Sequence, residues 1–117
     1  MKHNYKTKRI YEEPSDTDGC RILIDRLWPR GLSKAEVAIN EWDKDLAPSS
    51  ELRKWFGHDV NSWPEFQQRY ENELKKNEAV ASFLEKHKKD KVITLLYAAK
   101  DEEHNNAVVL KHFLEKE

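Results

Sequence analysis

The sequence predicts an α/β fold class: a small single-domain layered α/β fold with a short parallel or mixed sheet flanked by helices. Two apolar runs, residues 20–27 and 91–99, read as strands, and the stretch between them, residues 32–90, reads as mainly helical. A strand, a helical crossover and a second strand are typical of a parallel pair, and the crossover is expected to be right-handed. The 117 residues therefore predict one domain, 1–117, with a helical stretch inserted between the second strand and the central strand.

The strands differ in how clearly the sequence marks them. Residues 91–99, KVITLLYAA, are nearly all apolar and are expected at the centre of the sheet. Residues 20–27, CRILIDRL, contain the apolar triple ILI, which predicts a strand covered by helices on both faces. Residues 8–13, KRIYEE, form a shorter candidate that stops at Pro14. Because the turn SDTDG that follows is too short for a helical crossover, we expect the first two strands to pair antiparallel or to be joined irregularly.

The helical stretch opens with clear start signals. Ser33 and Glu36 form an S-x-x-E capping box, which predicts a helix from near Lys34. Apolar residues continue at helical spacing as far as Leu46, and Pro48 would end the helix.

Four further helices follow. Residues 49–57, SSELRKWFG, give a short helix with serine at its start and Gly57 at its C-terminal cap. The sequence NSWPEF opens the next helix, and a break near Asn77 separates it from a helix that carries Phe83. After the central strand, Asp101 is expected to cap the last helix.

Composition limits the functional classes. Lys and Arg number 21 against 22 Asp and Glu, so the net charge of -1 gives no indication of a nucleic-acid partner. No apolar run approaches the roughly 18 residues of a membrane span, and the N-terminus lacks the apolar core of a signal peptide, so we expect a cytoplasmic protein with no membrane partner. Cys20 is the only cysteine, which excludes an intrachain disulfide. Three glycines and no G-x-G-x-x-G or G-x-x-x-x-G-K-[ST] motif disfavour standard nucleotide-cofactor binding, and no cofactor is expected.

Polar side chains follow two strands of the predicted sheet, in residues 25–30 and 100–105. Open α/β sheets bind ligands at the carboxyl ends of their strands, so the two groups converge if these strands are parallel neighbours. The guanidinium fork of arginine suits carboxylate or phosphate, and imidazole exchanges protons near neutral pH. The candidates for binding an anionic ligand are Arg26, Arg30, Trp28, Lys100 and Asn105. The catalytic candidates are His58, His104, Asp25 and Asp101.

These residues also have structural explanations. The arginines can form exposed ion pairs, which contribute about 0 to 1 kcal/mol, and Asp101 suits a helix cap better than a catalytic acid. His58, Asp59, His104 and Asp25 could together supply metal ligands, but their spacing matches no diagnostic motif, so no metal site is predicted. Cys20 fits a small buried residue, and His87 fits the C-terminus of a helix, where imidazole interacts well with the dipole.

Four blocks of sequence carry a resemblance to a known family: RILIDRLWPRGLSK, EWDKDLAPSSELRKWFGHD, WPEFQQRYENEL and ITLLYAAKDEEHNNAVVLK. They are similar to the YeaO-like family of small bacterial proteins, the domain of unknown function family number 488, from about Ile10 to Leu114. The resemblance implies a compact cytoplasmic α/β domain whose biochemical role is unassigned. One position departs from the pattern, because Asn106 stands where the resemblance leads us to expect a second histidine.

Three hypotheses about function follow. The first is a small-molecule binder or enzyme that acts on a phosphate- or carboxylate-bearing ligand at the strand ends. The second is a non-enzymatic protein or nucleic-acid interaction module, which predicts a flat charged patch instead of a cleft. In the third, the charged blocks only tie loops together. The arrangement of Asp25, Arg30, His58 and His104, in one pocket or scattered, distinguishes them.

Overall fold

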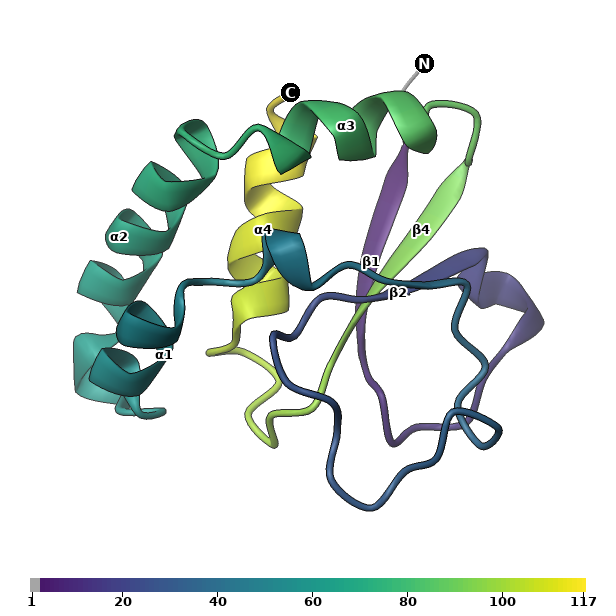
Figure 1. Cartoon of the computed structure of the whole chain (residues 1–117), viewed down its shortest axis with the longest axis horizontal. Coiled ribbons are helices and arrows are strands. Elements are labelled where there is room, and N and C mark those ends of the chain that lie inside the picture. Colours follow the sequence, from purple (N-terminus) through teal and green to yellow (C-terminus); the bar gives the residue numbers. More distant parts are fainter. Residues whose placement is uncertain (1–2) are drawn as a thin grey trace.

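The computed structural model describes residues 3–117, which form a four-stranded sheet with helices packed against it (Figure 1). The strands are β1 (Asn4–Arg9), β2 (Cys20–Leu23), β3 (Glu41–Trp42) and β4 (Val92–Tyr97). Their order is β1-β4-β2-β3, and every neighbouring pair is parallel. β4 is therefore an inner strand, as predicted, and five of its six residues are buried. The predicted α/β class, with helices inserted before the central strand, is confirmed.

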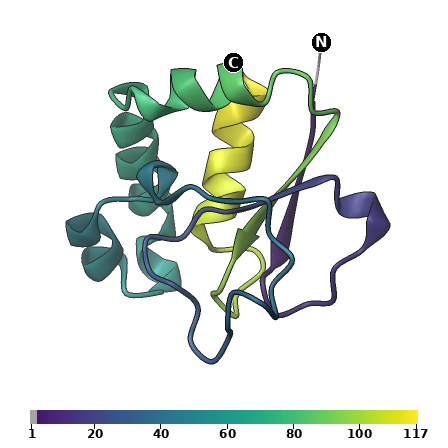
Figure 2. The ribbon, with the colours of Figure 1, turned by 45° about the vertical axis from the view of Figure 1, so that its right-hand side comes forward.

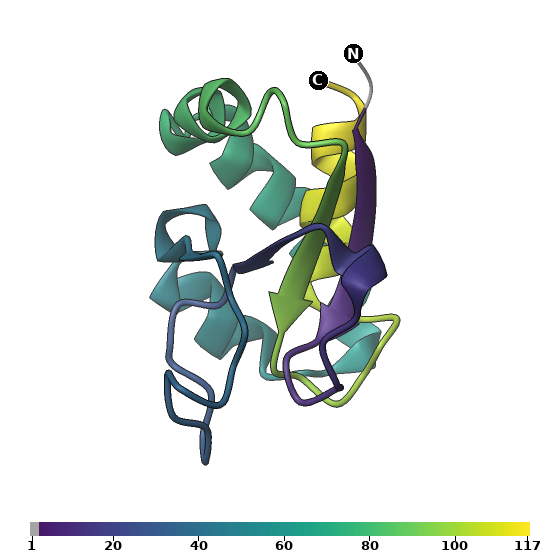
Figure 3. The ribbon, with the colours of Figure 1, turned by 90° about the vertical axis from the view of Figure 1, so that its right-hand side faces the viewer.

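The helices lie in layers on one face of the sheet. They are α1 (Ser50–Phe56), α2 (Trp63–Lys75), α3 (Ala79–Lys86) and α4 (Asn106–Glu115), with short 3-10 turns at Asp16–Asp18, Lys44–Leu46 and Val60–Ser62. α4 packs directly on β1 and β4, α2 packs on α4, and α1 packs on α2. Figure 3 shows α4 behind β1 and β4, with α2 farther back. Within residues 3–117, even the longest helix, the 13-residue α2, lacks the length and apolarity needed to cross a membrane.

The other face of the sheet is covered by a loop, residues 24–40, which Figure 2 shows as an extended segment without a helix. Along β4, Ile93 and Leu95 belong to the main core beneath the helices, whereas Leu96 belongs to a smaller core on the loop side. Trp28 and Trp42 pack against this smaller core. The expectation that helices cover both faces of residues 20–27 is therefore wrong on the loop side, because Trp28 of the loop and Trp42 of β3 cover the apolar surface there.

The first strand lies earlier than predicted, at Asn4–Arg9 instead of residues 8–13. β1 is an edge strand in which only Tyr5 is buried, so it lacks the apolar pattern by which strands are recognised. The antiparallel pairing of the first two strands is also wrong. β4 lies between β1 and β2 and is parallel to both.

Residues 10–19 return the chain to the starting end of the sheet. The Thr94 hydroxyl of β4 donates a hydrogen bond of 2.6 Å to the carbonyl of Asp18, and both groups are buried. Gly19 lies so close to Val92 that a Cβ at this position would be 2.4 Å from the Val92 carbonyl oxygen. This close approach lets a short irregular connection replace a helical crossover.

The predicted helix from Lys34 to Leu46 does not form, although its capping box does. Ser33 Oγ accepts from the Glu36 N–H at 3.3 Å, and the Glu36 carboxylate accepts from the Ser33 N–H at 2.9 Å, but the motif closes only a turn. The chain then becomes extended to add β3 to β2. In this conformation the indole N–H of Trp42 donates to the Asp25 carbonyl at 2.7 Å. Tertiary packing thus overrides the local helix signal.

The later helices follow the sequence more closely. α1 has the predicted ends, with Ser49 Oγ accepting from the Leu52 N–H at 3.1 Å and Gly57 left-handed at φ 51°. The break near Asn77 between α2 and α3 is also present. The expected cap of α4 at Asp101 is wrong, because the N-cap is Asn105.

Candidate ligand-binding pocket

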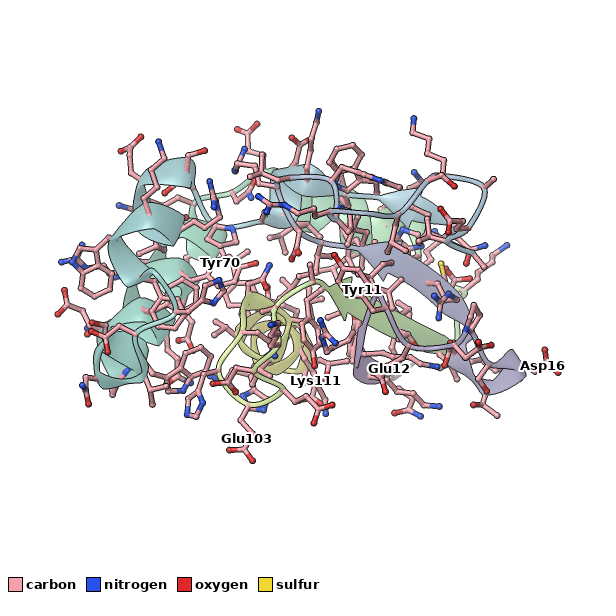
Figure 4. All side chains as sticks on the ribbon, turned by 90° about the horizontal axis from the view of Figure 1, so that it is seen from below. Tyr11, Glu12, Asp16, Tyr70, Glu103 and Lys111 are labelled. Carbon is pink, nitrogen blue, oxygen red and sulfur yellow. The ribbon has the colours of Figure 1, made fainter. Side chains whose placement is uncertain are left out.

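A pocket of about 410 Å³ lies where the chain leaves the carboxyl ends of β2 and β4. Figure 4 views the molecule from this side and labels Tyr11, which follows β1 and lines the pocket. α1 and the segment after it supply another wall, and the start of α4 supplies a third. The polar lining residues are Tyr11, Asp25, Arg26, Arg30, Arg53, His58, Asn105 and Asn106. The ends of adjacent parallel strands thus form a hollow, the position at which open α/β sheets bind ligands.

Asp25, which follows β2, links the ends of β2 and β4 to the start of α4. Its Oδ2 accepts from the Ala98 N–H at 2.9 Å, just beyond β4, and its Oδ1 accepts from Asn106 Nδ2 at 3.0 Å, in the first turn of α4. Burial raises the pKa of the Asp25 carboxyl, and these two hydrogen bonds together with the charges of His58 and Arg53 oppose that rise. Asp25 is therefore a structural link as well as a lining residue.

Two nitrogens of the Arg26 guanidinium donate hydrogen bonds to backbone carbonyls. Nε donates to the Pro48 carbonyl at 3.1 Å, and Nη2 donates to the Ala47 carbonyl at 3.4 Å. A guanidinium has five N–H donors, so the group fixes the loop before α1 and keeps donors for a ligand. It lines the pocket in a half-buried position.

Arg30, Arg53 and His58 are exposed lining residues from three different segments. Arg30 follows Pro29 in the loop, Arg53 lies on α1, and His58 follows the C-terminal cap of α1. His58 has φ 60°, the left-handed region that non-glycine residues adopt uncommonly and histidine more often than most. Two successive left-handed residues, Gly57 and His58, turn the chain sharply after α1 and bring the imidazole to the pocket.

Aromatic rings form the apolar part of the wall. Phe56 and Phe66 line the pocket and stack on each other with ring centroids 4.3 Å apart. Trp28 packs edge-on against Trp42 at 5.2 Å. Its indole N–H donates to the Leu32 carbonyl at 2.7 Å, so Trp28 presents a ring surface without a free donor to the pocket.

The predicted site residues are divided between this pocket and a neighbouring turn. Asp25, Arg26, Arg30, Trp28, His58 and Asn105 line the pocket. Lys100, Asp101 and His104 are outside its lining. Asn105 is 2% exposed and uses its amide as the cap of α4, with Oδ1 accepting from the Val108 N–H at 3.1 Å and Nδ2 donating to the Asp101 carbonyl at 2.9 Å.

The turn before α4 holds a separate pair of titratable groups. Asp101 Oδ1 accepts from the N–H groups of Glu103 and His104, at 2.9 and 3.0 Å, and these bonds lower the pKa of Asp101. Asp101 Oδ2 lies 2.9 Å from His104 Nδ1, and the His104 ring packs edge-on against Trp63 at 5.2 Å. Glu103, labelled in Figure 4, points away from the body of the molecule. This pair therefore organises a turn beside the pocket and does not face into it.

Three polar lining residues were missed from the sequence: Tyr11, Arg53 and Asn106. Arg53 looks like an ordinary exposed charge on a short helix, and only the position of α1 beside the strand ends brings it to the pocket. Asn106 stood out as a departure from the family pattern, and its role appears only with its partners: Asp25 Oδ1 at 3.0 Å and the Ile24 carbonyl at 3.3 Å. A sequence gives no signal for either contact.

Comparison with known proteins identifies relatives over nearly the whole chain. A family model described as the inactive DUF488-N3 subclade matches residues 4–117. The uncharacterized protein YeaO of Escherichia coli (strain K12) is 43% identical over 111 residues, which cover 95% of this chain and 96% of that protein. The uncharacterized protein Rv3073c of Mycobacterium tuberculosis (strain ATCC 25618 / H37Rv) is 38% identical over 109 residues, which cover 93% and 92%. No solved structure gives a significant match.

Proposed function

Because this chain belongs to the YeaO-like DUF488 family, as its motifs predicted, and to the inactive DUF488-N3 subclade within it, we propose that its pocket binds a small anionic molecule and does not transform it. The ligand carries a phosphate or carboxylate group on a planar or apolar body. The anionic group pairs with the arginines, and the body lies against the aromatic wall.

The observation that carries this proposal is the concentration of cationic side chains around one hollow. Arg26, Arg30 and Arg53 line it together with His58, whereas the chain as a whole has a net charge of -1. Asp25 is the single carboxylate in the lining, and both of its oxygens accept hydrogen bonds from the protein. Arginine forks bind phosphate and carboxylate bidentately, so this lining selects for negative charge.

Binding without catalysis fits the way the titratable groups are connected. General acid–base catalysis calls for an imidazole oriented by a partner and within reach of the substrate. Within residues 3–117, His58 has no hydrogen-bonded or ion-paired carboxylate. The imidazoles of His104 and His87, which do pair with carboxylates, lie outside the pocket lining. The description of the subclade as inactive agrees with this arrangement.

The test is a calorimetric binding titration at low ionic strength. The probes are inorganic phosphate, sulfate, nucleoside monophosphates and aromatic carboxylic acids. Arg30→Gln and Arg53→Gln are the informative variants. Both side chains are exposed, so their loss should leave the fold intact. We expect each to weaken binding of the best probe about 10-fold, because a charge-assisted hydrogen bond contributes about 1.5 kcal/mol or more. We expect added salt to weaken binding as well.

Arg69→Gln is the matched control. Arg69 is an exposed arginine of α2 that stacks on Trp55, with its guanidinium carbon 4.3 Å from the ring centroid, and it does not line the pocket. If no probe binds, or if the Arg30→Gln/Arg53→Gln double variant binds as tightly as Arg69→Gln, the proposed function is wrong.

A further inference from the structure

A second group of chemically reactive side chains lies at the opposite end of the sheet from the pocket. Cys20 is the first residue of β2, Asp90 precedes β4, and His87 caps the C-terminus of α3. β4 begins just after the end of α3 (Figure 1), so the turn between them brings His87 and Asp90 to the start of β2. We propose that Cys20, His87 and Asp90 form a binding site for a divalent transition-metal ion, with Zn²⁺ as the best-fitting ion.

The distances between the donor atoms suit one ion. The sulfur, imidazole nitrogen and carboxylate oxygen all lie within 4.8 Å of one another. Cys20 Sγ is 3.9 Å from His87 Nδ1, and Asp90 Oδ2 is 2.8 Å from the same nitrogen. Tetrahedral Zn²⁺ with its usual bond lengths holds neighbouring donor atoms about 3.3 to 3.7 Å apart. Shifts of less than about 1 Å would therefore complete three bonds and leave a fourth position for water.

The second nitrogen of His87 supports the assignment independently. His87 is 6% exposed, and its Nε2 is buried without a hydrogen-bond partner in the described part of the chain. A carboxylate oxygen, Glu41 Oε1 on β3, lies 3.5 Å from this nitrogen. A metal on Nδ1 places the proton on Nε2, which then donates toward this carboxylate. Such a carboxylate–histidine–metal relay is the usual outer-shell arrangement of a metal-bound histidine.

The surrounding charges favour a cation. Asp90 and Glu41 are carboxylates at the site, and Lys86, the basic side chain that pairs with Glu41, is exposed. The C-terminal end of α3 adds the negative end of a helix dipole. Cysteine, histidine and aspartate together form a mixed sulfur, nitrogen and oxygen donor set that suits Zn²⁺ better than Mg²⁺ or Ca²⁺, which prefer oxygen ligands alone.

A catalytic Cys-His-Asp triad fits these atoms less well. In a triad the imidazole uses one nitrogen for the thiol and the other for the carboxylate. Here Cys20 and Asp90 both face Nδ1 of His87. Burial, followed by the charge of Asp90, also raises the pKa of the Cys20 thiol to about 11, so the metal-free thiol is a poor nucleophile at neutral pH.

The experiment is a titration of the chelator-treated full chain with Zn²⁺ by calorimetry and with Co²⁺ by absorption. We expect one ion per chain and a thiolate-to-cobalt charge-transfer band. Cys20→Ser should abolish the band and weaken Zn²⁺ binding at least 100-fold, and Asp90→Asn should weaken it about 10-fold. Glu41→Gln should also weaken binding, by about 10-fold or more, but keep the band, because outer-shell changes weaken metal affinity 10- to 100-fold.

His104→Gln is the control histidine, since His104 follows β4 and therefore lies at the far end of that strand. It should leave the affinity and the cobalt spectrum unchanged. Cys20→Ser and Asp90→Asn preserve side-chain size, and their circular dichroism spectra report whether they fold. Absence of stoichiometric binding, a cobalt spectrum without the thiolate band, or equal Zn²⁺ affinity in the wild type and folded Cys20→Ser would each overturn the assignment.

Discussion

Removing the Asp25 carboxylate should destabilise the protein by about 2 kcal/mol at pH 7. Asp25→Ala leaves the Ala98 N–H and one amide hydrogen of Asn106 without their acceptor. Each orphaned donor contributes a penalty of about 1 to 3 kcal/mol when it is buried. Asn106 keeps its bond to the Ile24 carbonyl, and the variant also loses a carboxylate whose burial is unfavourable. These two effects offset part of the penalty, which leads to the value of about 2 kcal/mol.

The assay is urea unfolding, supported by thermal unfolding. A domain of this length loses about 4 °C in Tm for each kcal/mol, so Asp25→Ala should melt about 8 °C below the wild type. Asp101→Ala is the matched control, because Asp101 also accepts hydrogen bonds from backbone N–H groups but is more exposed and belongs to a turn. Asp101→Ala should therefore unfold much closer to the wild type than Asp25→Ala does, because water can replace the hydrogen bonds of an exposed carboxylate.

The pH dependence of the two variants has opposite signs. The pKa of Asp25 is raised in the folded state, so the native protein binds the Asp25 proton more tightly than the unfolded chain does. The contribution of Asp25 to stability therefore grows as the pH falls from 7 toward its ordinary pKa, and the difference between wild type and Asp25→Ala widens. The pKa of Asp101 is lowered, so its contribution is present above its ordinary pKa and is lost as the pH falls through the folded value. If the Asp25→Ala difference narrows on acidification, the account of a carboxylate held in a buried link is refuted.

Two further pairs of variants test how burial and backbone geometry contribute. Tyr70→Phe should lose about 1 to 2 kcal/mol of unfolding free energy, because its buried hydroxyl donates to a buried carbonyl at 2.6 Å. Tyr11→Phe, whose exposed hydroxyl donates at 2.8 Å, should lose less than about 0.5 kcal/mol. Similar losses in the two variants would contradict the role of burial. Gly19→Ala should lose several kcal/mol of unfolding free energy or prevent folding, since its Cβ would overlap the Val92 carbonyl. Gly31→Ala places its Cβ in open space at φ 81°, so it should lose about 1 to 3 kcal/mol from backbone strain alone. Denaturant unfolding of both variants measures the difference.

Parts of the fold could be predicted because local sequence and tertiary structure agree there. The apolar run of β4 is buried on both faces, and Ser49 and Gly57 carry their start and stop signals into α1. The region before α1 was mispredicted because its local and tertiary preferences conflict. Ser33 and Glu36 do form their reciprocal bonds, but the following residues gain more by extending beside β2.

The position of the pocket was predicted because open α/β sheets bind ligands at the carboxyl ends of their strands. The residues that line the pocket were predicted only in part. Asp25, Arg26 and Arg30 lie in the loop that begins at the end of β2, so their position depends mainly on where that strand ends. Arg53 reaches the pocket through the packing of α1, which the sequence does not specify. His104 was placed near the site by assuming that α4 begins at Asp101, but the turn before Asn105 directs it elsewhere.

The order of the strands has a consequence for how the chain acquires its structure. β4 pairs with β1, so β1 waits for a partner that is synthesised only after the helices α1 to α3. Contacts between residues so distant in sequence slow folding, because the intervening chain must be ordered before they contribute. Until residues 92–97 have left the ribosome, the sheet lacks the strand that joins β1 to β2. A nascent chain should therefore expose β1 and β2 as unpaired strands until residue 97 has left the exit tunnel, and this interval is when chaperone binding would matter most.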